Sequence, residues 1–252
     1  MRRWPHVVIQ GAGRGLGLAW ATRLLEEGRT DRLFATARSP ADRPGLEVLR
    51  DRFGDAVEAI ELDLTDPASI QGAAFRVGEQ IDRLHLLVNC GGVLHEPGVM
   101  EPEKKLEQVD PFALGRAFEV NATGPLLMAR WFWPLLRHDE RSVLVNLSAR
   151  VGSIEDNRLG GWYAYRASKA AQNILTRTLA IELGRRAPRC ICVALHPGTV
   201  DTDLSRPFQR GVPEQRLFSP DFAVERLLGV VDGLDSQDSG GFFAWDGSAI
   251  PW

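Results

Sequence analysis

Two kinds of hydrophobic pattern alternate along this chain. Short apolar runs predict seven buried strands, at residues 6–10, 32–37, 57–62, 84–89, 142–147, 190–195 and 241–245. Apolar residues recurring every three or four positions predict helices at 16–27, 46–53, 111–136, 163–184 and 220–234, and a further helix starts at Pro67 after the capping residue Asp66. Strands separated by helices pair in parallel, because each connection crosses back over the sheet. The pattern therefore predicts an α/β fold: a doubly wound, mostly parallel seven-stranded sheet with helices on both faces.

One domain is expected. No internal repeat, low-complexity segment or linker divides the 252 residues, and the Pro- and Gly-rich segments 39–45 and 202–220 are predicted to be loops within the domain 1–252.

Charge and hydropathy exclude several classes of protein. The formal net charge of −3 offers no basic surface for nucleic acid or an anionic membrane. No apolar run reaches the ~18 residues of a membrane-spanning helix, since Arg130 and Pro134 interrupt the longest one. The first five residues lead straight into a strand instead of the apolar region of a signal peptide, so a cytoplasmic protein is expected.

The three cysteines, Cys90, Cys190 and Cys192, are too few for a disulfide framework. Cys190 and Cys192 share one face of a predicted strand and are expected to be small buried hydrophobes. No cluster of His, Cys and Asp has metal-ligand spacing, so no metal is expected.

A glycine-rich loop joins the first predicted strand to the first helix. Glycines at such a turn let backbone N–H groups approach a pyrophosphate, whose charge the helix N-terminus favours. This context predicts a dinucleotide-binding Rossmann fold. The loop residues expected to contact the cofactor are Gly11, Gly13, Arg14, Gly15, Leu16 and Gly17.

The end of the second strand indicates which dinucleotide binds. NAD-binding loops usually carry an acidic residue there for the ribose hydroxyls, and this chain has Thr36-Ala37-Arg38 instead. Arg14 in the glycine loop could lie beside the same ribose. Two guanidinium groups suit a 2′-phosphate, so NADP(H) is the expected cofactor.

Tyr165 and Lys169 form a Tyr-x-x-x-Lys pair in the longest predicted helix. Their i, i+4 spacing places both side chains on one helix face. A phenol is a weak acid–base group at neutral pH, and a nearby ammonium favours its anion. Lysine is rare here, occurring only at positions 104, 105 and 169, so its place beside a tyrosine points to chemistry.

With Asn121 and Ser148, which precede the pair in order, the chain resembles the short-chain dehydrogenase/reductase family over essentially its whole length. The resemblance implies a catalytic tetrad of Asn121, Ser148, Tyr165 and Lys169. In it, Ser148 bonds the substrate carbonyl, Tyr165 transfers the proton, Lys169 also binds the nicotinamide ribose, and Asn121 holds a water that links Lys169 to solvent.

The same resemblance extends the expected cofactor site. It implies that Asp63 contacts the adenine ring; a helix-capping or turn carboxylate is the alternative interpretation of that residue. It also implies a segment at 196–202 that closes over the nicotinamide. The further cofactor-binding positions are Asp63, Leu64, Asn89, Gly91, Tyr165, Lys169, Pro197, Gly198, Val200 and Thr202. Gln10 and Cys90 depart from the family pattern: Gln10 is expected to weaken a loop hydrogen bond, and Cys90 to lack one that stabilises the next loop.

The interval from Ser148 to Tyr165 and the C-terminal Asp246-Gly247 resemble the C-factor and sniffer-type carbonyl reductase branch. This implies hydride transfer between NADP(H) and a carbonyl or alcohol substrate, in a homodimer or homotetramer. A cofactor-binding signalling protein with little turnover is the alternative. A hydrolase built on Ser148, His196 and Asp201 is a third reading, which lacks the Gly-x-Ser-x-Gly elbow.

Three aromatic residues, Trp162, Phe208 and Phe218, are candidates for the walls of the substrate pocket, or else for core and subunit contacts. His95 and His196 lie near the predicted cleft, where structural or loop roles are expected.

Overall fold

The computed structural model describes residues 1–252, and a seven-stranded parallel sheet runs through it in the order β3-β2-β1-β4-β5-β6-β9. Its strands are β1 (His6–Gln10), β2 (Arg32–Ala37), β3 (Val57–Glu61), β4 (Leu86–Asn89), β5 (Ser142–Leu147), β6 (Cys190–His196) and β9 (Phe242–Ala244). The seven predicted strands and the single doubly wound sheet are confirmed. The stretch 202–220, predicted as a loop, contains β8 (Leu217–Phe218), which pairs with β7 (Thr199–Val200) in a small second sheet.

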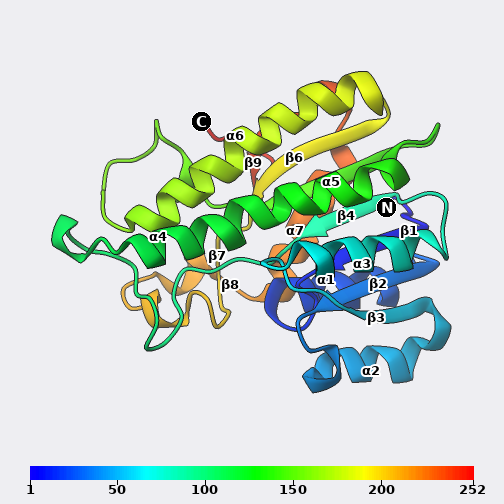
Figure 1. Cartoon of the computed structure of the whole chain (residues 1–252), viewed down its shortest axis with the longest axis horizontal. Coiled ribbons are helices and arrows are strands. Elements are labelled where there is room, and N and C mark those ends of the chain that lie inside the picture. Colours follow the sequence, from blue (N-terminus) through cyan, green and yellow to red (C-terminus); the bar gives the residue numbers. More distant parts are fainter.

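Helices cover both faces of the large sheet (Figure 1). The helices are α1 (Gly15–Glu26), α2 (Pro44–Phe53), α3 (Pro67–Gly78), α4 (Pro111–Phe118), α5 (Gly124–Leu136), α6 (Tyr163–Arg186) and α7 (Pro220–Gly233). One apolar cluster joins α1, α2 and α7 to the sheet, and a second joins α3, α5 and α6 to its other face. Burial on both faces explains why the strands are continuous apolar runs rather than alternating ones.

The single helix predicted at 111–136 is interrupted in its middle. A π-helical turn, Glu119–Thr123, separates α4 from α5. Pro125 has no N–H to donate to the carbonyl of Asn121, so the regular i to i+4 ladder cannot continue through this point. Such turns are frequent at functional sites, and this one carries the buried Asn121.

The strand order reverses beside β1, which lies between β2 and β4. Gln10 pairs with Thr36 on one side and with Asn89 on the other, and Asn89 pairs in turn with Asn146 of β5. The carboxyl ends of four strands are therefore level. The loops that follow them meet at one edge, where ligands bind in open α/β sheets.

Two smaller expectations are confirmed. Asp66 caps α3, since its carboxylate accepts a hydrogen bond from the Ala68 N–H at 2.9 Å. Cys190 and Cys192 are buried in β6, and all three cysteines are free thiols. Among the helices, none combines the length and the apolar character that crossing a membrane requires.

The two-layer core predicts a sharp contrast between two phenylalanines. Phe132 on α5 is fully buried in the second apolar cluster, whereas the Phe75 side chain on α3 is 69% exposed. We expect Phe132→Ala to lower the free energy of unfolding by about 3–5 kcal/mol, because it leaves a cavity, and Phe75→Ala to change it by less than about 1 kcal/mol. Urea unfolding of both variants measures this. Equal losses would contradict the described packing.

Candidate active site

The glycine loop can be built only from glycine at its key positions. Gly11 and Gly15 have φ angles of +80° and +53°, which favour glycine. A Cβ on Gly17 would lie 2.1 Å from the carbonyl oxygen of Gly11, so the start of α1 is in direct contact with the end of β1. Arg14, the residue before α1, makes no side-chain cap. The first N–H groups of the helix are thus uncapped by a side chain, as a pyrophosphate site requires.

The loop after β4 forms the facing wall. The N–H of Gly91 donates to the side-chain oxygen of Gln10 at 2.8 Å, so Gln10 provides a bond between the two loops. The expected weakening at this position is thus offset by a contact that the sequence did not reveal. A Cβ on Gly11 would lie only 3.0 Å from the nitrogen of Gly91, which shows how closely the loops pack. The side chain of Asn89 is buried and donates to Asn146 at 2.7 Å. Burial raises the pKa of the Cys90 thiol.

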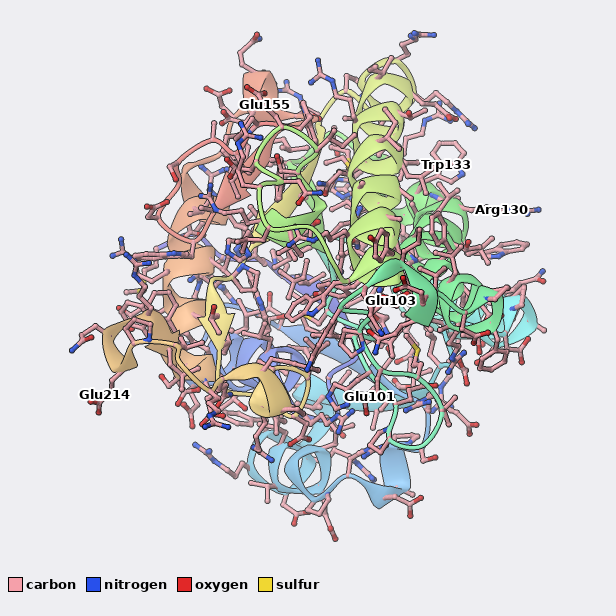
Figure 2. All side chains as sticks on the ribbon, turned by 90° about the vertical axis from the view of Figure 1, so that its left-hand side faces the viewer. Glu101, Glu103, Arg130, Trp133, Glu155 and Glu214 are labelled. Atoms are coloured by element: carbon pink, nitrogen blue, oxygen red, sulfur yellow. The ribbon has the colours of Figure 1, made fainter.

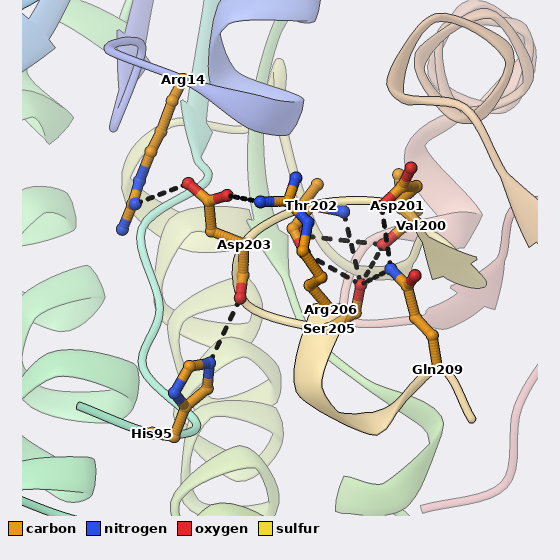
Figure 3. A network of polar contacts seen from close by, with 9 residues as sticks. All are labelled: Arg14, His95, Val200, Asp201, Thr202, Asp203, Ser205, Arg206 and Gln209. Carbon is orange, nitrogen blue, oxygen red and sulfur yellow. Dashed lines mark hydrogen bonds and ion pairs between the residues drawn. The ribbon is translucent and has the colours of Figure 1, made fainter. Parts of the chain in front are cut away.

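Two arginines lie at the end of β2, and a third, Arg14, points away to the segment after β6, so that its place beside the ribose stays a prediction. Arg38 is exposed at the end of β2, as predicted. Arg43, which the sequence reasoning missed, lays its aliphatic stem against Gly13, where an added Cβ would lie 3.0 Å from the Arg43 Cδ. Arg14 points to Asp203 and pairs with its carboxylate at 2.8 Å (Figure 3). Arg14 is therefore shared between the glycine loop and the segment that covers it.

Asp63 follows β3 and forms a turn. Its Oδ1 accepts hydrogen bonds from the Thr65 N–H at 2.9 Å and from the Thr65 hydroxyl at 2.8 Å. Burial opposes ionisation of Asp63, but these two bonds and the charge of Arg38 hold its pKa below the usual value. The turn role of this residue is confirmed, and the adenine contact stays a prediction.

The four predicted catalytic residues come from three elements at the same edge. Ser148 directly follows β5, Asn121 lies in the π-helical turn, and Tyr165 and Lys169 lie one turn apart on α6. A Cβ on Gly92 would lie 3.3 Å from Asn121 Oδ1 and 3.8 Å from Lys169 Nζ, so Gly92 lies between those two side chains.

No two of these four side chains hydrogen-bond each other, and three of them, Asn121, Ser148 and Lys169, are held by other residues. Lys169 Nζ donates to the Leu147 carbonyl at 2.8 Å and to Gln172 Oε1 at 2.9 Å. The Ser148 hydroxyl donates to Asn173 Oδ1 at 2.6 Å. Gln172 and Asn173 were missed, although their spacing of three and four residues from Lys169 places them on its helix face.

Asn121 is held from both ends of its amide. Its Oδ1 accepts from the Val93 N–H, and its Nδ2 donates to the Val93 carbonyl, both at 2.8 Å. Nδ2 also donates to the Ser168 hydroxyl at 3.0 Å. This triple contact ties the π-helical turn to the loop after β4 and to α6.

Burial controls the ionisation of the Tyr–Lys pair. It raises the pKa of Tyr165, whose hydroxyl has no hydrogen-bond partner within the protein. It lowers the pKa of Lys169 to about 7. Burial is thus the dominant influence on the pKa of Tyr165, since Nζ of Lys169 donates to Leu147 and Gln172. That Lys169 favours the Tyr165 anion stays a prediction.

The segment that follows β6 covers the glycine loop. A Cβ on Gly15 would lie 3.3 Å from the Thr202 methyl group, so Thr202 lies directly over the glycine loop. Asp203 then joins three segments, since its carboxylate also pairs with Arg206 at 2.8 Å and its carbonyl accepts from His95 Nε2 at 3.2 Å (Figure 3). The expected loop role of His95 is confirmed by this contact.

Two of the three candidate wall residues cluster near Tyr165. The Trp162 ring lies 6.2 Å from the Tyr165 ring and 5.3 Å from that of Phe208, which also contacts His95. The partly buried Phe218 packs instead on Phe222 and Trp245 and against Gly198, where an added Cβ would lie 2.7 Å from its ring.

The hydrolase reading is wrong, because its three residues are not connected. Ser148 donates to Asn173, Asp201 accepts from Gln209, and the buried His196 Nδ1 has no partner. Burial lowers the pKa of His196 to about 4, which makes it a poor base at neutral pH. No group of three or more His, Cys, Asp or Glu side chains is arranged to hold a metal ion.

The buried ammonium makes stability depend on pH. Because Lys169 has a lower pKa when folded, the unfolded chain binds the extra proton between about pH 7 and its ordinary pKa of 10.5. We expect the free energy of unfolding of the wild type, measured relative to that of Lys169→Met, to rise with pH over this range by up to about 1.4 kcal/mol per pH unit. As the pH falls back towards 7, this gain in stability should disappear. Urea unfolding without cofactor at several pH values measures it, and parallel curves for the two proteins would contradict the burial.

Known proteins match this architecture over its full length. The family profile described as short chain dehydrogenase matches residues 5–212. An NADPH-bound carbonyl reductase from chicken fatty liver superposes with a TM-score of 0.88 at 30% identity, and the carbonyl reductase Sniffer of Drosophila melanogaster with 0.87 at 25% identity. Each comparison covers 100% of both chains.

Among characterised sequences, the C-signal protein of Myxococcus xanthus is 39% identical over 147 residues, which is 58% of this chain and 83% of that protein. The resemblance to the C-factor and sniffer-type branch is confirmed by these similarities. Since the family profile covers well over half of it, the chain belongs to the short chain dehydrogenase family.

Proposed function

We propose that this protein is an NADPH-dependent carbonyl reductase. The observation that carries the proposal is the placement of Tyr165, with a hydroxyl free of protein partners, one helical turn from the buried Lys169 and beside the glycine loop edge. The two carbonyl reductases of similar structure support the reaction class.

The described residues fit a dinucleotide. The glycine loop leaves the first N–H groups of α1 without a side-chain cap. Gly11 packs so closely against Gly91 that there is no room for a side chain at Gly11. When bound, the nicotinamide would supply the hydride. Gly15 and Leu16 would hold the pyrophosphate, Val200 and Thr202 would cover the nicotinamide end, and Arg38 would lie at the adenine ribose.

The chain's own residues would then handle the proton. Tyr165 donates its hydroxyl proton to the carbonyl oxygen as negative charge develops there, and Ser148 orients that oxygen. Burial raises the pKa of Tyr165, so the residue holds its proton until a stronger base forms beside it. Lys169, with a pKa near 7, can both take up and pass on a proton at neutral pH. Asn121 fixes the loop and helix that flank this path.

The proton donor can be tested with a matched control in the same helix. Tyr165→Phe should lower kcat for NADPH oxidation by about 10²- to 10⁴-fold, the usual contribution of a general acid, and leave the Kd for NADPH unchanged. Tyr163→Phe, two residues earlier and exposed, should behave like the wild type. The assay follows NADPH oxidation over aliphatic, aromatic and quinone carbonyls. Tight NADPH binding without turnover above that of Tyr165→Phe would favour the signalling alternative, which the similarity to C-signal raises.

The preference for NADPH over NADH rests on the arginines at the end of β2. Arg38 replaces the acid that would bind two ribose hydroxyls, and Arg43 lies beside Gly13. We expect Arg38→Asp to raise the Kd for NADPH by about 30-fold or more, since it removes charge-assisted bonds to a phosphate, and to improve NADH binding. Titration of both cofactors by fluorescence measures this. Arg50→Asp on the exposed side of α2 is the control, and an unchanged NADPH/NADH ratio in Arg38→Asp would exclude this assignment.

The proposal includes a homodimer or homotetramer built on the long helices. Ile174 and Ile181 lie two turns apart on the exposed side of α6. Trp133 of α5 lies against Arg186 of α6, whose guanidinium is 3.9 Å from the centre of its ring, and Figure 2 shows Trp133 projecting from the surface with Arg130. A second copy of the chain would cover this apolar face.

A further inference from the structure

We propose that Glu103 is a positioning residue for Tyr165: its buried carboxylate holds the first turn of α6 in place. The inference rests on the proposed function, because the role of Tyr165 as proton donor belongs to it. Glu103 lies in the long loop between β4 and α4, about 60 residues before α6 in the chain, and Figure 2 shows it at the end of α6 where that helix begins.

Glu103 accepts hydrogen bonds from two backbone N–H groups at the start of α6. Its carboxylate oxygens accept from the Ala164 N–H at 3.2 and 3.3 Å, and its backbone carbonyl accepts from the Trp162 N–H at 2.5 Å. Only 3% of Glu103 is exposed, so the contact is shielded from water.

The helix needs this external acceptor. The first N–H groups of a helix have no partner within it, and a side-chain oxygen at the preceding residue usually satisfies one of them. Here that residue is Trp162, whose indole has no acceptor. Because Ala164 is buried, water does not readily replace the missing cap. Glu103 therefore does from a distant segment what a local cap does in other helices.

The backbone before α6 is unusual in the same place. Gly160, Gly161 and Trp162 have φ angles of +64°, +65° and +51°, and Trp162 is the only residue other than glycine with a positive φ. Such a conformation persists only where the surroundings fix it. The bond from the Trp162 N–H to Glu103 is one such contact. A second is the packing of Gly161 over the Glu103 carbonyl, where an added Cβ would lie 3.2 Å away.

The position of Tyr165 depends directly on this turn. Tyr165 follows Ala164, and its ring lies 6.2 Å from that of Trp162, so a shift of the first turn moves both aromatic side chains. Lys169 lies one turn further along and is held independently by Leu147 and Gln172. Loss of the Glu103 carboxylate should therefore impair proton transfer while the cofactor site stays intact.

The test compares Glu103→Met, which keeps the length of the side chain without its acceptor, with Glu103→Gln, whose amide oxygen can still accept from Ala164. Glu103→Ala replaces Glu103→Met if that variant does not fold. Glu101→Gln, two residues earlier and exposed, is the matched control. The readouts are kcat for the best carbonyl substrate, the Kd for NADPH, and hydrogen exchange of the peptide 160–166.

We expect Glu103→Met to lower kcat about tenfold with the Kd for NADPH within twofold of the wild type, and to speed exchange in the peptide 160–166. Glu103→Gln should restore kcat to within about threefold of the wild type and slow the exchange again. Glu101→Gln should match the wild type.

Three results would overturn the inference. Unchanged exchange in Glu103→Met means that the carboxylate does not hold the helix start. Faster exchange with an unchanged kcat means that the contact is structural only. A parallel loss of NADPH affinity means that the whole site has been disturbed. A wild type that reduces no carbonyl would instead refute the proposed function, and hydrogen exchange alone would then decide whether Glu103 holds α6.

Discussion

The buried ammonium of Lys169 is the interaction around which this site is built. A charge inside a protein is costly unless oxygens surround it, and the Leu147 carbonyl and the Gln172 amide supply them. Since Leu147 ends β5, the contact ties α6 to the carboxyl edge of the sheet. Gly152 makes the approach possible, because a Cβ there would lie 2.7 Å from the Cβ of Lys169. The need of the Lys169 ammonium for oxygen partners thus holds the end of β5, the loop at Gly152 and α6 together.

Because Lys169 needs polar partners, the face of α6 that is turned towards the sheet is polar around it. Its buried side chains include Ser168, Lys169, Gln172, Asn173 and Thr176, which pair with one another, with backbone or with Asn146. Each of these side chains has at least one partner, which restrains the helix, while the Gln172 Nε2 group is buried without one. The apolar packing on this face comes from α3 and α5, where Phe132 and its neighbours cover the sheet, and from the second half of α6, where Ala180 and Leu183 join the same cluster. The polar contacts of α6 and its packing into this cluster therefore lie in successive parts of the helix.

Local patterns carried most of what the sequence could predict. Strands, the glycine loop and the Tyr165–Lys169 pair depend on spacing within a few residues, and all occur as predicted. The misses depend on partners far away in the chain. Nothing near Glu103 indicates that it meets Ala164, and nothing near Arg14 indicates Asp203. The π-helical turn was not predicted for another reason. The apolar periodicity of a helix continues through Pro125, and this periodicity is independent of the backbone hydrogen bond that proline lacks.

Asp203 gives the site an order of assembly. Its partner Arg14 belongs to a loop that is among the first parts of the chain to be synthesised, yet the two residues are separated by 189 positions. Contacts of such long range form late, because the entropy of closing the loop must be offset by strands already paired. During synthesis the glycine loop and α1 can fold onto β1 and β2, but their cover does not exist until residue 203 has left the ribosome. The part of the molecule that carries the glycine loop thus lacks this contact through most of translation.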